Sequence, residues 1–323
     1  MDKARGSIVI ISIFAVSIFA VGFMGIHLPA RAQTGRRGQW TAFNRAGGPT
    51  SNLQCFTPNN VRVSGGNLAI DTKAEVAACS SFDLAPAHRS YTSGFVSMRA
   101  FNFLYGTVEF RAKFGGGTHS GAWPAVWMAD ASCQTSDPAG TDDRCNEQEI
   151  DIAEILKSDF THVNQQIHVD RFHYNDSCTA STTDASRNFH VYQLVWSAAS
   201  LVFKIDGIAT CTITRHIPNA AMYLKIDMNV GGFGGPVNNG GLPWTTVVDY
   251  VKVTQGSNVV FNEDFDREDA VEPAPAHAPS SLDRPNPPHL HAIRLRWAML
   301  AAISSLAIIW VLTARWRRGS KRH

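Results

Sequence analysis

Between Trp40 and Phe265 the chain is a succession of short runs in which hydrophobic and polar residues alternate. The run GTVEFRAKF, residues 106–114, is typical, because every second residue from Val108 onward is hydrophobic. A period of two puts alternate side chains on opposite faces of a β-strand. Gly, Asn, Asp and Ser separate the runs, and no stretch keeps a 3.6-residue period long enough for a large helix. We therefore predict an all-β fold, a single large β-sandwich or jelly roll.

The N-terminus differs from this body. Lys3 and Arg5 precede a hydrophobic run from Ile8 to Ile26, and Ala30-Arg31-Ala32 fits a small-x-small cleavage site. Residues 1–32 are therefore predicted to be a secretory signal peptide. Because the hydrophobic run is long for a signal, an uncleaved signal anchor is the alternative.

The C-terminal part suggests a membrane anchor. Residues 297–314 form 18 consecutive positions without a charge, which is enough to span a bilayer, and we predict a transmembrane helix over 295–314. The tail 315–323 carries five Lys or Arg and is expected to stay cytoplasmic, so the body is expected to be exported and membrane-anchored, on the extracytoplasmic side. Residues 267–294 contain six prolines and are predicted to be an extended linker. A buried C-terminal helix is the alternative to a membrane span.

Charge excludes one class of partner. The formal net charge of the chain is +2, but the positive charges gather at the two ends. Without Asp2, the three positive residues before residue 33 and the five after residue 314, 21 Lys or Arg face 26 Asp or Glu. This balance gives no nucleic-acid footprint, whereas a neutral or polyol ligand fits it.

Six cysteines lie in the body, at positions 55, 79, 133, 145, 178 and 211. An even number in an exported chain predicts up to three disulfides, and the spacings do not form a CxxC zinc pattern. We expect a Cys133–Cys145 bond, because these two residues bracket the loop QTSDPAGTDDR. The other pairings stay open.

The run CNEQEIDIAEIL, residues 145–156, threads acids through β-branched residues. On a strand, Glu149 and Asp151 share a face, and Ile150 and Ile152 point into the core. Glu154 is out of phase, but a β-bulge at Ile152–Ala153 would return it to the acidic face. Three carboxylates on one face raise at least one pKa, which is typical of sites that need an acid and a base together. A carboxyl pair about 5–5.5 Å apart is the geometry of retaining glycoside hydrolysis.

Two other interpretations of this run stay open. It could be an exposed acidic strand, or it could bind a structural Ca²⁺, although the EF-hand spacing and its glycine are missing. Upstream, SGAWPAVWMAD holds Trp123 and Trp127, and aromatic faces bind the apolar faces of sugar rings. For Trp127 a place in the core is the alternative.

The segments YTSGFVSM, YGTVEFRAKF, GAWPAVWM, EIDIAEI, NQQIHV, FHVYQLVWSAASLVFKIDG and DYVKV occur in the order found in glycoside hydrolase family 16. Over roughly residues 91–253 the chain resembles the laminarinase-like, endo-β-glucanase branch of that family. The resemblance implies a concanavalin A-like jelly roll over residues 33–266, with a cleft across its concave sheet. It also implies retaining hydrolysis of β-glycans.

The resemblance assigns roles by position. It implies that Glu149 is the nucleophile, Glu154 the acid/base and Asp151 the assisting carboxylate. His168 matches a histidine near the acid/base, with a core histidine as the alternative. For substrate binding it implies Arg111 at the cleft edge and the aromatic residues Trp123, Trp127 and Trp244, with a surface ion pair as the alternative for Arg111.

From these observations we expect a monomer that needs no cofactor or metal and cuts β-1,3- or mixed β-1,3/1,4-glucan internally. Two other functions stay open: a membrane-tethered transglycosylase that remodels cell-wall glycan, and a non-catalytic glycan receptor. The long loop between Ala131 and Glu147, and the absence of an aromatic residue after Ile155, leave the glycan undecided. Whether the sequon Asn175-Asp176-Ser177 is glycosylated is also open.

Overall fold

The structure is a computed structural model and describes residues 33–34, 39–47, 52–79, 87–98, 100–132, 147–170 and 173–274. The predicted signal segment, the linker beyond residue 274, the predicted transmembrane helix, the basic tail and the expected Cys133–Cys145 bond lie outside these residues. Within the described ranges, no helix is long and hydrophobic enough to cross a membrane.

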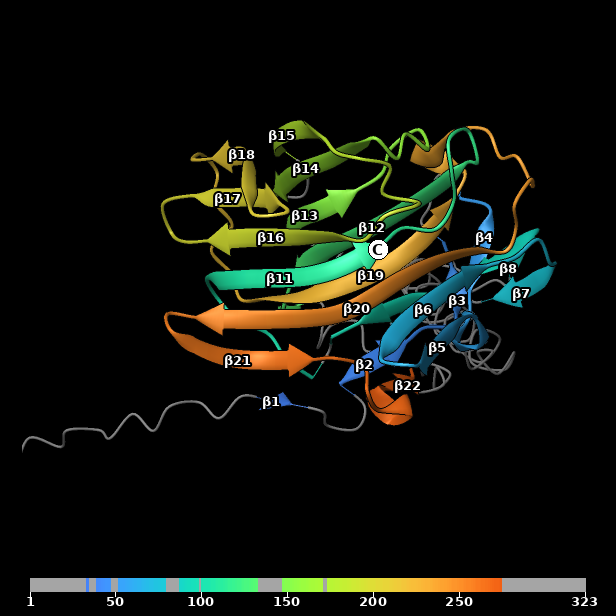
Figure 1. The fold of residues 1–323 in the computed structure, drawn as a ribbon, viewed down its shortest axis with the longest axis horizontal. Coiled ribbons are helices and arrows are strands. Elements are labelled where there is room, and N and C mark those ends of the chain that lie inside the picture. Colours follow the sequence, from blue (N-terminus) through green and yellow to red (C-terminus); the bar gives the residue numbers. More distant parts are fainter. Residues whose placement is uncertain are drawn as a thin grey trace, which may run out of the picture.

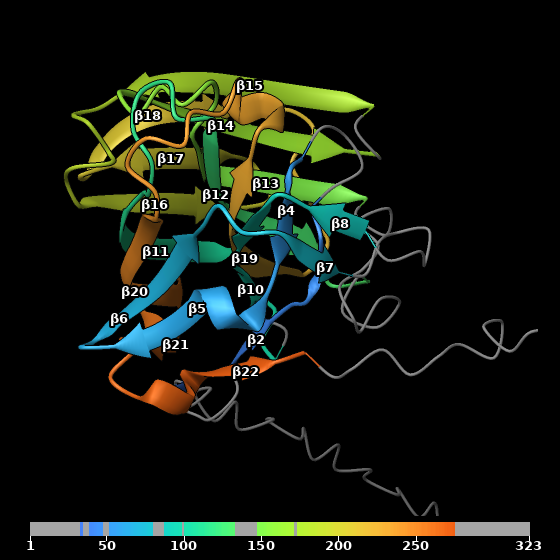
Figure 2. The ribbon, with the colours of Figure 1, turned by 90° about the vertical axis from the view of Figure 1, so that its right-hand side faces the viewer.

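Two large sheets face each other in a sandwich, which confirms the all-β prediction (Figure 1 and Figure 2). One sheet has nine strands: β1 (Gln33–Thr34), β21 (Asn258–Glu263), β20 (Trp244–Gln255), β11 (Gly106–Lys113), β16 (His190–Trp196), β17 (Leu201–Ile205) and β18 (Ile208–Ile213) in spatial order, then β6 (Asn67–Thr72) paired with β20 and β5 (Val61–Ser64) paired with β6. The other has eight strands in the order β15 (Tyr174–Ser181), β14 (His162–Val169), β13 (Gln148–Glu154), β12 (Ala122–Asp130), β19 (Met222–Val230), β10 (Phe95–Ser97), β2 (Trp40–Ala42) and β22 (Val271–Pro273).

Smaller elements lie around the sandwich, most of them to the right in Figure 1. They are the sheet of β3 (Arg45–Ala46), β4 (Gln54–Phe56) and β9 (Tyr91–Ser93), the pair β7 (Ala77–Cys79) and β8 (Ala87–Arg89), and the 3-10 helices η1 (Pro58–Asn60), η3 (Gly232–Gly234) and η4 (Glu268–Ala270).

The core lies between the two sheets and follows from the alternation seen in the sequence. On β11, Val108, Phe110 and Ala112 are fully buried, whereas the residues between them are partly exposed. From the opposite sheet, Ile150 and Ile226 are equally buried in the same cluster. Full burial of a large hydrophobic side chain stabilises a fold by about 1.5–3 kcal/mol. The two sheets therefore hold each other in place through the inward half of each strand.

The folded body extends further than the sequence predicted. Residues 267–274 were assigned to the linker, but Val271 pairs with Trp40, and the amide of Ala274 donates to the carbonyl of Ala42 at 2.7 Å. Ala270 is 1% exposed and belongs to the core. A proline is tolerated here because β22 is an edge strand, where Pro273 has no ladder hydrogen bond to break on its outer side. The prolines therefore did not mark the domain boundary.

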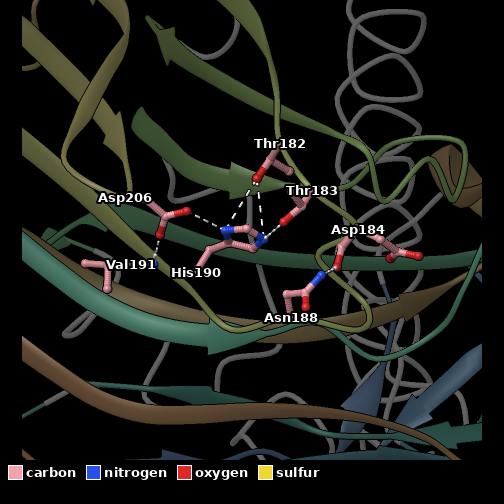
Figure 3. A network of polar contacts seen from close by, with 7 residues as sticks. All are labelled: Thr182, Thr183, Asp184, Asn188, His190, Val191 and Asp206. Carbon is pink, nitrogen blue, oxygen red and sulfur yellow. Dashed lines mark hydrogen bonds and ion pairs between the residues drawn. The ribbon is translucent and has the colours of Figure 1, made fainter.

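A polar network fixes the segment that leads from β15 to β16, and hence from one sheet to the other (Figure 3). His190 is 5% exposed; its Nδ1 lies 2.6 Å from Asp206 Oδ2, and its Nε2 lies 3.0 Å from Thr183 Oγ1. The other oxygen of Asp206 accepts the amide hydrogen of Val191 at 2.9 Å. Asp206 begins the Asp206-Gly207 turn between β17 and β18, so His190 joins this turn to the crossing segment.

Two disulfides lie within the described residues. Cys178–Cys211 joins β15 to β18, which are edge strands of opposite sheets, and Cys55–Cys79 joins β4 to β7. The first bond therefore links the two sheets covalently at the end of the sandwich that carries β14 and β15.

We predict that the double variant Cys178→Ala/Cys211→Ala is less stable than the wild type by about 2–4 kcal/mol, because the bond closes a loop with a sequence separation of 33 residues. Guanidinium unfolding followed by tryptophan fluorescence measures this difference. Hydrogen exchange should be faster in β15 for this variant, but not for Cys55→Ala/Cys79→Ala. Equal exchange of β15 in the two variants would contradict a role for the bond at this edge.

Candidate active site

A β-bulge lies in β13 at the predicted position. Against β12, Ala153 pairs with Val126, but Asp151 pairs with the next residue, Trp127, so Ile152 is the extra residue. Against β14, the register also shifts between Asp151 and Glu154. The bulge at Ile152–Ala153 is therefore confirmed from both neighbouring strands.

The bulge puts three carboxylates on one face of the eight-stranded sheet. Ile150, Ile152 and Ala153 are fully buried in the core between the sheets. Glu149 and Asp151 alternate with the isoleucines and point away from that core, and Glu154 is hydrogen-bonded to Trp123 on this outer side. The side chains of Glu149 and Asp151 are only 15% and 6% exposed. These acids are therefore largely removed from water.

Glu154 accepts three side-chain hydrogen bonds. Trp123 Nε1 donates to Oε1 at 2.8 Å, and the amides of Asn164 and Gln166 donate to Oε2 at 3.2 and 2.8 Å. Burial raises the pKa of Glu154, and the charge of Asp151 raises it further, against these hydrogen bonds, to about 8. At neutral pH this carboxyl group therefore holds a proton that it can donate.

His168 on β14 faces the other two acids. Its Nε2 lies 3.4 Å from Asp151 Oδ2 and 3.9 Å from Glu149 Oε1. Burial opposes the charged imidazolium, but the hydrogen bond and charge of Asp151 outweigh it, so the pKa of His168 is raised. The raised pKa favours the charged imidazolium, and His168 lies beside Glu149 and Asp151, whereas the resemblance predicted a histidine near the acid/base Glu154.

Glu149, Asp151 and His168 bring their donor atoms within 4.8 Å of one another, which is close enough to consider a metal. The raised pKa of His168 favours the imidazolium, which has no lone pair for a metal. Among the described residues no other group of three or more acids, histidines or cysteines comes this close together. The geometry thus favours proton-transfer chemistry at this group.

Phe233 is a member of the site that sequence reasoning missed. It lies in η3 with 65% of its surface exposed, and its ring meets that of Trp123 edge-on at 5.0 Å. Trp123 in turn bonds Glu154, so two aromatic rings border the acidic group. The available signal was a lone aromatic residue in the run VGGFGGP, where the glycines permit a tight turn: Gly232 has φ of 55°, and a Cβ there would meet Asn52 Oδ1 at 2.5 Å.

Trp127 and Trp244 are both largely buried. Trp127 is 9% exposed; its Nε1 donates to Asp227 Oδ2 at 3.1 Å, and Lys225 Nζ lies 4.1 Å from the ring centre. Its ring packs with Phe95 on the acid-bearing side of the sheet, since its neighbours on β12 point into the core, and its contact with a sugar stays a prediction. Trp244 is 4% exposed and belongs to the core between the sheets, so its assignment as a subsite is wrong.

Arg111 does not lie near the acids, contrary to its predicted place at the cleft edge. It lies on β11 in the nine-stranded sheet, between the buried Phe110 and Ala112, so it points away from the core on the side opposite the acids. Its Nη1 donates to Asp249 Oδ2 at 2.7 Å, and its guanidinium lies 4.3 Å from the ring centre of Phe189. The surface ion pair named as the alternative is what the structure contains.

Residues 54–252 match the profile of the family described as Glycosyl hydrolases family 16. A keratan-sulfate endo-1,4-beta-galactosidase of Sphingobacterium multivorum is 28% identical over 174 residues, which cover 50% of this chain and 40% of that protein. A glucan endo-1,3-beta-glucosidase A1 of Niallia circulans is 29% identical over 229 residues, which cover 62% and 32%. The chain spans between 32% and 55% of the length of the curated relatives it matches.

Solved structures share the fold. The laminarinase catalytic domain of Thermotoga maritima MSB8 superposes with a TM-score of 0.57 at 23% identity, covering 68% of this chain and 92% of that one. A variant of SCLam, a non-specific endo-beta-1,3(4)-glucanase crystallised with 1,3-beta-D-cellotriosyl-glucose, superposes with a TM-score of 0.56 at 30% identity, covering 68% and 88%.

We predict that the carboxyl group of Glu154 titrates near pH 8, and that Asp151→Asn lowers this pKa, because it removes the neighbouring charge. Carbon-13 NMR of protein labelled at the glutamate carboxyl groups measures both values, and the signal is assigned by its loss in Glu154→Gln. A midpoint near the ordinary value of 4.5 in the wild type would contradict the raised pKa.

Proposed function

The chain belongs to glycosyl hydrolase family 16 and is a glycoside hydrolase, and we propose that it cuts internal β-glycosidic bonds of a β-1,3- or mixed β-1,3/1,4-glucan with retention of configuration. One observation carries the proposal. Glu149, Asp151 and Glu154 lie on one face of the sheet, and the pKa of Glu154 is raised to about 8. An acid that keeps its proton therefore lies on the same strand as two acids that have different neighbours.

In the proposed first step, Glu149 attacks the anomeric carbon while Glu154 gives its proton to the oxygen of the departing sugar. The bond between that oxygen and the anomeric carbon breaks, and a glycosyl ester forms on Glu149. Burial favours the protonated form of Glu154 before the transfer. The hydrogen bonds from Trp123, Asn164 and Gln166 stabilise the carboxylate that the transfer creates.

In the second step, the Glu154 carboxylate takes a proton from water as the water oxygen attacks the same carbon from the other side of the ester. Glu149 leaves as a carboxylate. The imidazolium of His168, 3.9 Å from Glu149 Oε1, favours the charge that returns to Glu149. Asp151 lies between the two glutamates on the strand and shares this imidazolium, which makes it the assisting carboxylate of the proposal.

The glucan assignment rests on the relatives and on the rings beside the acids. Most of the named relatives act, by their names, on β-1,3- or β-1,3(4)-glucans, whereas one acts on keratan sulfate. The exposed ring of Phe233, edge-on to Trp123, offers the apolar contact that a glucan ring uses. A neutral glucan therefore suits this side of the acids.

Transglycosylation is the second candidate, because another sugar can take the place of water at the glycosyl ester. The exposure of Phe233 favours it, since an open ring can hold an acceptor sugar. Laminarin with an added acceptor oligosaccharide separates the two: transfer gives products longer than the acceptor, and hydrolysis gives none.

We also propose that residues 295–314 hold the enzyme at the outer face of a membrane, which membrane fractionation with and without this segment tests.

We predict that Glu149→Ala and Glu154→Ala each lose at least about 100-fold of kcat on laminarin, and that azide reveals their different roles. With a dinitrophenyl β-laminaribioside, azide should occupy the space of the missing nucleophile in Glu149→Ala and give the α-glycosyl azide. In Glu154→Ala the ester still forms on Glu149, so azide should give the β-glycosyl azide. NMR of the products identifies each anomer.

The matched control is Glu147→Ala, which removes an exposed acid from the same run just before the strand and should keep wild-type rates. The roles would be reversed if the two variants exchanged their azide products. A receptor without catalysis would be the correct reading if purified wild-type protein bound laminarin and released no reducing ends.

We predict that Phe233→Ala lowers kcat/KM on laminarin by about tenfold, mainly by raising KM, because the ring contact is lost while the acids stay in place. Phe189→Ala is the control, since Phe189 packs on Arg111 at the opposite side of the sandwich. The measurement is initial rates across purified laminarin, lichenan and keratan sulfate, with products resolved by size and linkage. A higher rate on keratan sulfate than on either glucan would overturn the substrate assignment.

A further inference from the structure

Asn175 stands directly behind the histidine of the site. It belongs to β15, the edge strand of the eight-stranded sheet, and pairs with His168 across the ladder. Its side-chain oxygen is hydrogen-bonded to His168 Nδ1. The other ring nitrogen, Nε2, faces Asp151 and Glu149 at 3.4 and 3.9 Å. His168 is thus held between an amide oxygen on one side and two carboxylates on the other.

These contacts restrict where the ring can carry protons. An amide oxygen accepts hydrogen bonds and does not donate them, so Nδ1 must carry a hydrogen to bond Asn175. A neutral imidazole has only one N–H, so Nε2 would then turn a lone pair toward two carboxylates. Only the imidazolium can donate to Asn175 and also turn an N–H toward the acids.

We propose that Asn175 is a positioning residue that lets His168 direct an N–H toward Asp151 and Glu149 only as an imidazolium. The proposal rests on the proposed function in so far as Glu149 is the nucleophile. Without the amide oxygen, a neutral ring could carry its hydrogen on Nε2 and point it at the acids with the same geometry. That ring would have no positive charge. Asn175 therefore exchanges a neutral hydrogen-bond donor for a charged one, and the charge is what stabilises the carboxylates.

The other charged groups around His168 agree with this arrangement. From β13 it is faced by Asp151 and Glu149, and the charge of Glu154 also acts on it. The groups that flank Asn175 have other contacts: Asp176 on β15 pairs with Arg215 and His216, and the ring of His173, just before β15, meets Tyr174 edge-on. The uncharged Asn175 is thus the group of β15 that bonds the ring.

The consequence for the reaction is a loss of assistance as His168 loses its proton. Above the pKa of His168 the lone pair of Nε2 faces the acids, and the carboxylate of Glu149 is no longer stabilised when it leaves the glycosyl ester. In Asn175→Leu the neutral ring can turn its single hydrogen to Nε2, and the loss of the hydrogen bond to Asn175 lowers the pKa of His168. Asn175→Asp keeps an acceptor and strengthens it with a charge.

The test is nitrogen-15 NMR of the histidine side chains in the full chain produced in bacteria, a host that does not glycosylate the Asn175-Asp176-Ser177 sequon. The signals of His168 are assigned by their loss in His168→Gln. In the wild type, we expect the neutral ring at high pH to carry its hydrogen on Nδ1. In Asn175→Leu we expect the hydrogen on Nε2 and a titration midpoint at lower pH, and in Asn175→Asp the wild-type tautomer and a midpoint at higher pH.

Kinetics provide the second measurement. At a pH between the His168 midpoints that NMR gives for the two proteins, Asn175→Leu should lose about tenfold in kcat on laminarin with little change in KM. Asn175→Asp should recover most of this loss, since it restores the acceptor that favours the imidazolium. The control is Ser177→Ala, two residues along the same face of β15 and opposite Gln166 instead of His168.

The proposal is overturned if the neutral wild-type ring carries its hydrogen on Nε2, or if Asn175→Leu leaves tautomer and midpoint unchanged. Both results can be read without any turnover. An expected NMR result with no hydrolysis of any glycan would instead refute the proposed function and leave the role of Asn175 toward His168 intact.

Discussion

Electrostatic repulsion among three nearly buried carboxylates is the constraint on which the rest of this structure depends. Charges that are removed from water destabilise a fold unless partners compensate them. Here two of the acids face His168, whose pKa is raised, and the third keeps its proton and accepts hydrogen bonds from an indole and two amides. The site therefore carries less net charge than its composition suggests.

Rigid support for this arrangement comes from the core on the other side of the strand. Ile150, Ile152 and Ala153 are fully buried between the sheets, so β13 cannot move to relieve the repulsion without opening the core. Neighbouring strands add the partners: Trp123 from β12, and Asn164, Gln166 and His168 from β14. Strand pairing alone thus fixes which donors meet which acid.

The sequence predicted the part of the site that depends on local phase. Hydrophobic alternation gave the all-β class, and the interruption at Ala153 located the bulge and the face of Glu154. Predictions from the sequence failed where the position of a side chain depends on long-range packing. Alternation indicates that Arg111 points away from a core, but it does not indicate which sheet carries its strand. A tryptophan such as Trp244 suits a hydrophobic core as well as a sugar-binding site. Phe233 was missed because no period marks a single aromatic residue in a glycine-rich turn.

The bulge in β13 has a consequence for how such a strand can change. A run one residue shorter at the bulge, such as E-I-D-I-E, would already put all three acids on one side by simple alternation. The extra residue is therefore not what chooses the side for Glu154; it changes the angle at which that side chain leaves a more strongly twisted strand. Both spacings keep the isoleucines inside. Gain or loss of a single codon is thus a short evolutionary step between two directions of the same acidic side chain. The hydrophobic pattern of the strand is preserved in both cases.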